Sequence, residues 1–218
     1  LRCASGMAAV LGLDAAALES ICAQATHESL ESLAALESAP TTSGAYPGLP
    51  PGPHPGAGRV VVANDNAPGQ VVISGARPAL ERAMELAKAA GARRVVPLTV
   101  SGAFHSPVMA PAAVGLAAAV DAAPWQDARV PIISNITARP ISAASALREE
   151  LAHQIASPVQ WTKSVEFLAD AGVRCFVEIG HGQVLSGLIK RIAKGIDVFS
   201  VSSAADLAPV AREVRAPR

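Results

Sequence analysis

Cysteine, excess charge of one sign and long apolar runs are all scarce in this sequence of 218 residues. The three cysteines, Cys3, Cys22 and Cys175, are widely spaced and form no C-x-x-C pair, which argues against a disulfide framework and against a zinc site. We interpret them as small buried residues in a reducing compartment. The 18 basic residues balance the 18 acidic ones, so nucleic acid is disfavoured as a partner.

The apolar stretch near the N-terminus is too short for a membrane span. Residues Met7 to Leu13 are followed by Asp14, before the stretch reaches the length of a signal-peptide core or a transmembrane helix. We therefore expect a cytoplasmic protein without a membrane partner. Half of the residues are apolar, enough for a sizeable core. Because the chain begins with Leu1 and not with methionine, we also expect it to be a piece of a longer reading frame.

The first half of the chain predicts one small closed unit, residues 6–98. A short apolar strand precedes Asp14, which is suited to cap a helix. A Pro- and Gly-rich stretch, 39–58, is interpreted as an exposed insertion into this unit. The order strand, helix, strand, strand, helix, strand is ferredoxin-like. The other expected elements are strands at 59–63 and 70–74 around a turn at 64–69, a helix at 77–90 that Gly91 ends with a left-handed cap, and a strand at 94–100.

The second half, residues 99–205, predicts an α/β layer. Two short apolar segments, VPIISN at 130–135 and CFVEI at 175–179, have the composition of strands that helices bury on both faces. The tail from Ala208 shows little periodicity and predicts no element. Further expected elements are helices at 106–122, 145–155, 162–171 and 184–193 and a strand at 198–201.

Three motifs occur in an order and spacing that carry a family resemblance. They are NDNAPGQVVISG at 64–75, PLTVSGAFHSPVM at 97–109 and the long stretch from SPVQWTKSVEFL to VLSGLIKRI at 157–192. Together they resemble the second half of the malonyl-CoA:acyl-carrier-protein transacylases. The resemblance implies an α/β fold: a ferredoxin-like small subdomain, and in residues 99–205 the C-terminal part of an α/β-hydrolase-like parallel-sheet subdomain.

The resemblance also implies a reaction. These enzymes transfer a malonyl group from coenzyme A to the thiol of acyl carrier protein in fatty acid synthesis, through an acyl-serine. No cofactor or metal is expected, because the coenzyme A thioester is a substrate that is already activated. Malonyl-CoA and acyl carrier protein are the implied partners.

Part of the machinery that the family uses is missing from the sequence. The nucleophile of such enzymes lies on a G-x-S-x-G elbow, and no such pentapeptide occurs in the 218 residues. The glutamine of the N-terminal oxyanion loop and the arginine that pairs with the malonyl carboxylate are also missing. We therefore predict that this chain alone is inactive and that a separate N-terminal fragment is a candidate partner.

His105 is the candidate general base. It follows a predicted strand in a loop of small residues, and loops at such strand ends face the ligand crevice of open α/β proteins. Taken alone, its local sequence, a single histidine beside a phenylalanine, is more typical of a packed structural residue than of a catalytic one. The resemblance assigns it the proton transfer from the serine hydroxyl. By the same resemblance the backbone carbonyl of Gln154 orients its ring; the alternative for Gln154 is a polar helix end.

Other candidate residues have a structural alternative beside the functional one. Asn64 and Asn66 either contact substrate or stabilise the predicted turn. Lys190 and Arg191 either contact the acidic carrier protein or form an ordinary solvated face. His181 stands in a Gly-His-Gly turn where the family usually has Gly-Pro-Gly, and free amides at such a strand-to-helix turn suit an anionic or carbonyl oxygen.

Two rival functions remain open from the sequence. One is an acyltransferase domain of a polyketide synthase, which shares the fold and the chemistry. The other is a truncated, non-catalytic remnant that binds carrier protein or nothing.

Overall fold

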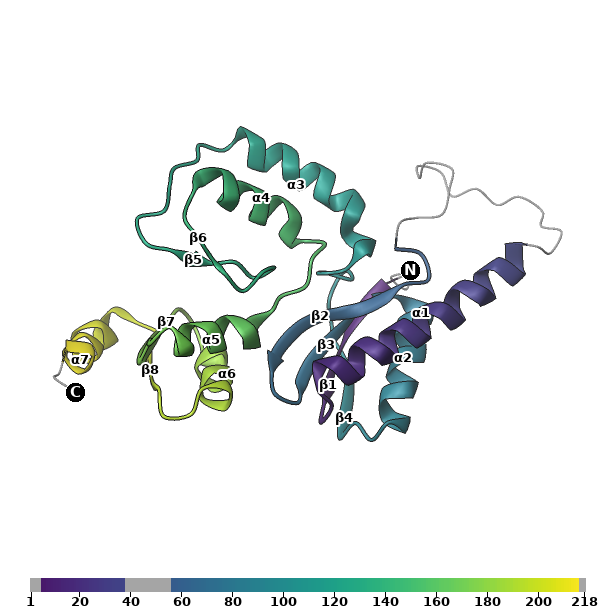
Figure 1. Ribbon diagram of the computed structural model, residues 1–218, viewed down its shortest axis with the longest axis horizontal. Coiled ribbons are helices and arrows are strands. Elements are labelled where there is room, and N and C mark those ends of the chain that lie inside the picture. The colour runs from purple at the N-terminus through teal and green to yellow at the C-terminus, as the bar shows by residue number, and fades with distance from the viewer. Residues whose placement is uncertain (1–4, 38–55, 216–218) are drawn as a thin grey trace.

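The structure is a computed structural model that describes residues 5–37 and 56–215. Nearly all of the Pro- and Gly-rich stretch at 39–58 lies outside the described residues, as does Cys3. Figure 1 shows the first sheet with α1 and α2 at one end of the molecule and α7 at the other. No helix in these two described ranges has a stretch long and apolar enough to cross a bilayer.

The described chain contains both helices and strands. The strands are β1 (Ser5–Leu11), β2 (Val60–Ala67), β3 (Gln70–Ala76), β4 (Arg94–Pro97), β5 (Ile132–Ile133), β6 (Pro140–Ile141), β7 (Cys175–Ile179) and β8 (Asp197–Val201). The helices are α1 (Ala15–Glu37), α2 (Arg77–Ala89), α3 (Ala110–Ala122), α4 (Ala144–Gln154), α5 (Trp161–Asp170), α6 (Val184–Ile192) and α7 (Ala204–Arg215), and a 3₁₀ turn, η1, covers Pro107–Met109.

The first four strands form one antiparallel sheet in the order β2-β3-β1-β4. Because side chains alternate along a strand, Ala8 and Val10 of β1 point to the opposite face from Met7. The first face packs against α1 and α2 and forms the main core. Met7 belongs to a smaller cluster on the second face, where Phe104 packs. Phe104, which directly precedes His105, therefore attaches the histidine loop to the second face of the sheet.

Two local features of this first region were predicted from the sequence. The backbone N–H of Ala17 donates to Asp14 Oδ1 at 2.8 Å, so Asp14 caps the start of α1. Gly91 follows α2 with φ +90°, a dihedral that glycine adopts without steric cost. The order of the six elements is the predicted one.

The predicted turn at 64–69 was wrong in extent. Strand β2 continues to Ala67, so only Pro68 and Gly69 separate it from β3. Two register shifts interrupt the β2–β3 pairing, between Val62 and Asn64 and between Asp65 and Ala67. These bulges let a polar Asn-Asp-Asn sequence remain in the strand, because a bulge changes the direction of side chains and of free backbone groups.

The strand predicted at 130–135 is much shorter than expected and is not buried. Only Ile132 and Ile133 are extended, and they pair in antiparallel fashion with Pro140–Ile141. Val130 is 70% exposed. Burial on both faces requires neighbouring strands with helices over them, and no other described strand joins this pair.

The CFVEI segment does form a strand, β7, which pairs in parallel with β8. The prediction that it is buried on both faces was wrong, because Ile179 is 78% exposed. The last helix, α7, was not predicted. Its start carries one half of a capping box: the backbone N–H of Ser203 donates to Asp206 Oδ2 at 2.8 Å, a signal that periodicity alone does not reveal.

Candidate active site

The backbone at His105 adopts a left-handed conformation, with φ +59°. Non-glycine residues avoid this region unless the surroundings hold them there. Two hydrogen bonds do so: the His105 N–H donates to Ile155 O at 2.9 Å, and the Ser106 hydroxyl donates to Ala103 O at 2.7 Å. Ser106 is almost fully buried. The loop therefore holds the His105 side chain in one defined place.

The imidazole of His105 lies against the end of helix α4. Its Nδ1 is 3.0 Å from the backbone oxygen of Gln154, which confirms the predicted contact between residues 49 positions apart. Gln154 is the last residue of α4, where carbonyls have no partner within the helix. A carbonyl oxygen only accepts, so Nδ1 carries the proton and Nε2 is left as an acceptor. This is the tautomer that a general base working through Nε2 requires.

The segment that accepts the hydrogen bonds of His105, here called the histidine-holding segment, runs from Gln154 to Thr162. It is itself bound to strand β2. The Val159 N–H donates to Ala63 O at 2.8 Å, and the Asp65 N–H donates to Val159 O at 3.0 Å, so this segment adds a short parallel bridge to β2. The Thr162 hydroxyl lies 2.8 Å from Asp65 Oδ1. The sequence analysis missed Asp65 and Thr162. These residues are 97 positions apart, and no local pattern links them.

Asn64 and Asn66 lie in β2 and not in a turn, which corrects the predicted environment of both side chains. Both are half-buried. Asn64 pairs with Val72 of β3 and forms the bridge to Val159. The backbone of Asn64 is thus part of the junction between β2 and the histidine-holding segment. A substrate contact by the side chains of Asn64 and Asn66 stays a prediction.

Lys190 and Arg191 differ in their surroundings although they are neighbours at the end of α6. The Arg191 guanidinium donates to Pro68 O at 3.0 Å and to the side-chain oxygen of Gln70. It therefore fixes α6 against the β2–β3 turn. Lys190 is exposed. A carrier-protein contact by these two residues stays a prediction.

The first amides of helix α6, after the Gly180-His181-Gly182 turn, are occupied by a side chain of the protein. Glu178 accepts hydrogen bonds from the backbone N–H groups of Leu185 and Ser186, at 3.1 and 2.8 Å. Hydrogen bonding from Ser186, through its side chain first and its amide second, holds the pKa of Glu178 below its ordinary value. These two amides are not free for a ligand oxygen, and His181 is exposed.

The thiol of Cys22 is not a substitute for the serine of the missing elbow. Cys22 is buried, and burial raises the pKa of its thiol to about 12, so it stays protonated and is a poor nucleophile. Cys22 and Cys175 are both free thiols. Within the two described ranges no group of three or more His, Cys, Asp and Glu side chains is arranged to hold a metal ion.

Comparison with known proteins identifies the family. The acyl transferase domain profile matches residues 54–216, about three quarters of the chain. This chain belongs to the acyl transferase domain family. Over 196 residues it is 39% identical to the malonyl CoA-acyl carrier protein transacylase of Bacillus subtilis, a match that covers 90% of this chain and 53% of the relative. The chain spans about half the length of the curated relatives it matches.

Solved acyltransferase structures share the fold. The malonyl-CoA:acyl carrier protein transacylase of Xanthomonas oryzae superposes with a TM-score of 0.79 and 34% identity, covering 98% of this chain and 59% of that one. A second structure is a malonyl-transacylase in complex with a type II polyketide synthase acyl-carrier protein. It superposes with a TM-score of 0.80 and 31% identity, covering 98% of this chain and 60% of that one. Nearly the whole of this chain thus has a counterpart within about three fifths of these acyltransferase chains.

Proposed function

We propose that this chain supplies the histidine half of a malonyl-CoA:acyl-carrier-protein transacylase. The observation that carries the proposal is the His105 ring, whose Nδ1 lies 3.0 Å from Gln154 O. The family membership and the names of the relatives support the same reaction. In this proposal residues 6–98 form a ferredoxin-like small subdomain, and residues 99–205 form the C-terminal part of the α/β acyltransferase subdomain.

In the proposed reaction His105 moves one proton in each half of the transfer. Nε2 takes the proton of a serine hydroxyl, outside this chain, as the oxygen attacks the thioester carbonyl of malonyl-CoA. The imidazolium then returns the proton to the departing coenzyme A sulfur, which leaves a malonyl-serine. In the second half Nε2 takes the proton of the carrier thiol, which attacks the malonyl-serine, and returns it to the serine oxygen.

The partner at Nδ1 decides how strongly the charged intermediate is stabilised. Gln154 O fixes the tautomer as a carboxylate would, but it carries no full negative charge. The proposed imidazolium is therefore less stabilised than one beside an aspartate. A thioester is an activated acyl donor, so we propose that no cofactor or metal takes part.

The remaining proposed contacts are with the substrates. We assign Asn64 and Asn66 to the substrate side of the site, and Lys190 and Arg191 to the approach of acyl carrier protein. The proposed compartment is the cytoplasm, where the free thiols of Cys22 and Cys175 would remain reduced.

The direct test is to incubate this chain with malonyl-CoA and acyl carrier protein and to weigh both proteins by intact-mass spectrometry. We expect no malonyl group on either protein, because a general base without its nucleophile leaves little catalysis. A stable malonyl adduct on a serine of this chain would contradict the proposal that the nucleophile lies elsewhere.

The assignment of His105 has its own test in the isolated chain. Nitrogen-15 NMR, recorded at a pH high enough for the histidine rings to be neutral, should show His105 as the Nδ1–H tautomer. His27, an exposed histidine 3.5 Å from the Glu31 carboxylate on α1, serves as the reference ring. A His105 ring protonated mainly on Nε2 would refute the general-base assignment, because the acceptor nitrogen would then face Gln154.

A further inference from the structure

The contact between His105 and Gln154 joins two parts of the molecule that different elements hold in place. His105 follows Phe104, which packs on the second face of the first sheet in a cluster that includes Ala63 of β2. Gln154 is the last residue of α4, which packs against α3. The 3.0 Å distance between the imidazole and Gln154 O therefore depends on what fixes the histidine-holding segment to the sheet.

The histidine-holding segment lies along the outer edge of β2. Strand β2 is the outermost strand in the order β2-β3-β1-β4, so one of its edges faces away from the sheet. On this edge the Val159 N–H donates to Ala63 O at 2.8 Å, and the Asp65 N–H donates to Val159 O at 3.0 Å. Ala63 thus takes part in both attachments, because its side chain also lies in the cluster with Phe104. A shift of the segment along β2 would move Gln154 O relative to the imidazole.

Thr162 adds a side-chain contact at the end of the segment. It is buried, and its hydroxyl lies 2.8 Å from Asp65 Oδ1 and 3.1 Å from Asp65 O. A hydroxyl has a single hydrogen, so it donates to one of these two oxygens at a time. Hydrogen bonds that a carboxylate accepts are stronger than those between neutral groups. Asp65 therefore binds the segment twice, through its N–H to Val159 O and through its oxygens to Thr162.

The contact lies where β2 is irregular. The pairing of β2 with β3 shifts register between Val62 and Asn64 and again between Asp65 and Ala67. A bulge changes the direction of a side chain and takes backbone groups out of the ladder. The two irregularities on either side of Asp65 thus leave both its backbone and its carboxylate available to the segment.

We propose that Thr162 is a positioning residue for the candidate base. By binding Asp65 it fixes where the histidine-holding segment lies along β2, and so it keeps Gln154 O at the imidazole of His105. A neighbouring contact, from the Gln160 N–H to Asn135 O at 2.8 Å, ties the segment to the second half of the molecule and does not fix it against the sheet. The inference rests on the proposed function, in which the tautomer of His105 is the property that matters.

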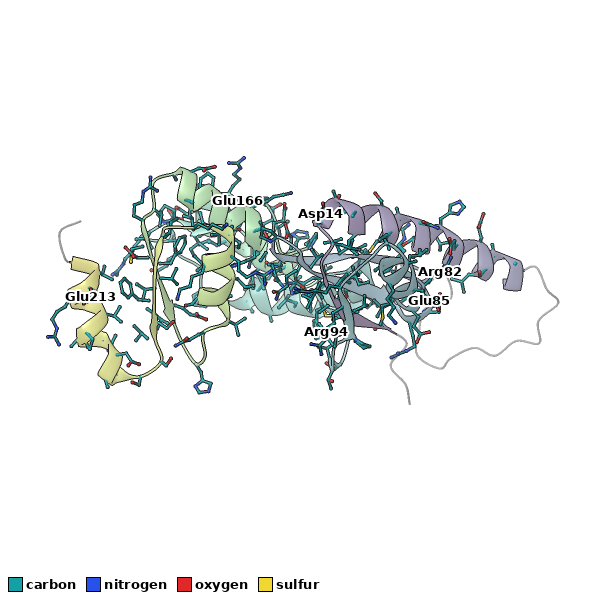
Figure 2. All side chains as sticks on the ribbon, turned by 90° about the horizontal axis from the view of Figure 1, so that it is seen from below. Asp14, Arg82, Glu85, Arg94, Glu166 and Glu213 are labelled. Carbon is teal, nitrogen blue, oxygen red and sulfur yellow. The ribbon has the colours of Figure 1, made fainter. Side chains whose placement is uncertain are left out.

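The surroundings of the Thr162–Asp65 contact are polar. A hollow beside it is lined by several charged side chains, among them Asp14, Asp65, Lys163 and Glu166. Figure 2 shows Glu166 of α5 and Asp14 at the start of α1 near the junction of the two halves of the molecule. Solvent in this hollow can replace a lost hydroxyl partner of Asp65. The effect of a Thr162 substitution should therefore appear in the position of the segment more than in overall stability.

The test is Thr162→Val, which keeps the shape of the side chain and removes the hydroxyl. We expect the backbone amide of His105, which donates to Ile155 O, to exchange with water about ten times faster. Nitrogen-15 NMR should show part of the His105 ring as the Nε2–H tautomer, because Gln154 O no longer holds the proton on Nδ1. Unchanged amide exchange and an unchanged ring in the folded variant would overturn the proposal.

The matched control is Thr26→Val. The Thr26 hydroxyl also binds the backbone of β2, but at Val60, the end of the strand away from the histidine-holding segment. Urea unfolding should show similar losses of stability in the two valine variants, whereas only Thr162→Val should change His105. An equal change of His105 in Thr26→Val would contradict the proposal, because general loosening of β2 would then explain it.

Three further variants test whether the hydroxyl acts through Asp65. Thr162→Ser keeps the hydroxyl and should restore the His105 signals of the parent. Asp65→Ala removes the carboxylate and should speed exchange at His105, and combining it with Thr162→Val should add little, because both changes remove one shared contact. A serine variant that behaves like valine, or fully additive effects in the double variant, would overturn the proposal. If Thr162→Val does not fold, Asp65→Ala decides in its place, and unchanged His105 exchange there would overturn it.

The readouts separate this inference from the proposed function. If the ring of the parent chain is protonated on Nε2, the general-base assignment fails, while the amide of His105 still reports whether Thr162 positions the segment. If the parent ring is the Nδ1–H tautomer but neither ring nor amide responds to Thr162→Val, only the positioning inference fails. Both measurements are made on the chain itself, without substrate.

Discussion

The two halves of the molecule differ in how completely they bury their apolar residues. In the first, β1 to β4 with α1 and α2, the side chains of Leu18, Ile73, Val10 and Val71 are fully buried. In the second, β5 to β8 with α3 to α7, Val165 is the one large apolar side chain in the described residues that is buried to the same degree. The first half buries the apolar side chains of its sheet under its own helices, whereas the second half leaves several apolar side chains exposed to solvent.

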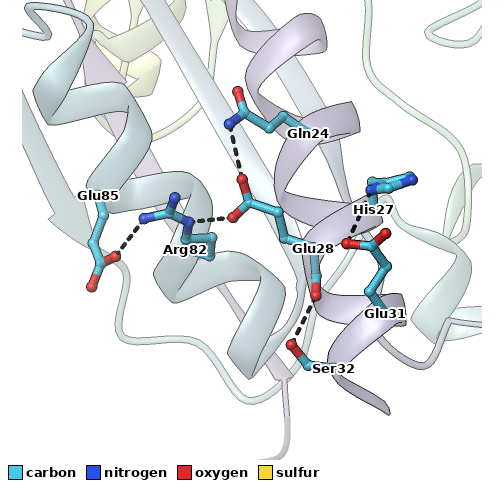
Figure 3. A network of polar contacts seen from close by, with 7 residues as sticks. All are labelled: Gln24, His27, Glu28, Glu31, Ser32, Arg82 and Glu85. Atoms are coloured by element: carbon cyan, nitrogen blue, oxygen red, sulfur yellow. Dashed lines mark hydrogen bonds and ion pairs between the residues drawn. The ribbon is translucent and has the colours of Figure 1, made fainter. Parts of the chain in front are cut away.

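Polar contacts do not explain this contrast. Figure 3 shows the network between α1 and α2, in which Arg82 binds Glu28 at 2.5 Å and Glu85 at 3.2 Å. The hydrogen bond from Arg82 is the main cause that lowers the pKa of Glu28. These side chains are solvated, so their pairing contributes little to stability. The stability of the first half therefore comes from its buried core.

The largest expected effect is at Gly75 in the first half. A Cβ at this position would lie 2.2 Å from Arg59 O and 2.5 Å from Val60 Cα, both backbone atoms of the adjacent strand segment. Gly75→Ala should therefore destabilise the sheet by about 4 kcal/mol or more. Gly115→Ala on α3, where nothing lies within 4 Å, is the control and should stabilise by up to about 1 kcal/mol. Urea unfolding of the three proteins measures both.

Two isoleucines test the contrast directly. Ile73→Ala removes a fully buried side chain from the core and should cost about 2 to 5 kcal/mol. Ile179→Ala acts on a residue that is 78% exposed and should change stability by less than about 0.5 kcal/mol. Thermal and urea unfolding give both values. A large cost at Ile179 in the isolated chain would mean that its edge is already covered.

The cap of α1 is expected to have a medium effect. Asp14→Ala removes the acceptor of the Ala17 N–H, and such losses cost about 1 kcal/mol. Asp14→Asn keeps an oxygen in place and should recover most of the loss. Comparing the two variants by urea unfolding separates the hydrogen bond from the charge, and equal losses would show that charge is the important property.

The smallest expected effect is a pH dependence in the second half. The pKa of Glu178 is lower in the folded chain than its ordinary value of 4.5. A depressed carboxyl pKa stabilises the fold above the unfolded pKa, and this contribution is lost as the pH falls through the folded pKa. The melting temperature of Glu178→Gln should therefore approach that of the parent below pH 4 and fall slightly below it near pH 7. A constant difference across this range would exclude the linkage.

Local patterns accounted for the order of elements, and a motif resemblance accounted for the His105 contact. The helix cap at Asp14 and the left-handed Gly91 depend on neighbouring residues, so they are readable from the chain. The extent of β2 could not be predicted in this way. Two bulges keep Asn64 and Asn66 in a strand, although both residues favour turns. The contact of Thr162 in the histidine-holding segment with Asp65 could not be predicted either, because these two residues are 97 positions apart.

What the sequence by itself determined is the family and the identity of the candidate base, because motifs are properties of adjacent residues. What only the tertiary structure decided is which apolar strands are covered and which residues hold the base in place. VPIISN and CFVEI have the composition of buried strands, yet Val130 and Ile179 lie in solvent. Burial depends on neighbours distant in sequence or outside the chain, and composition cannot record whether those neighbours are present.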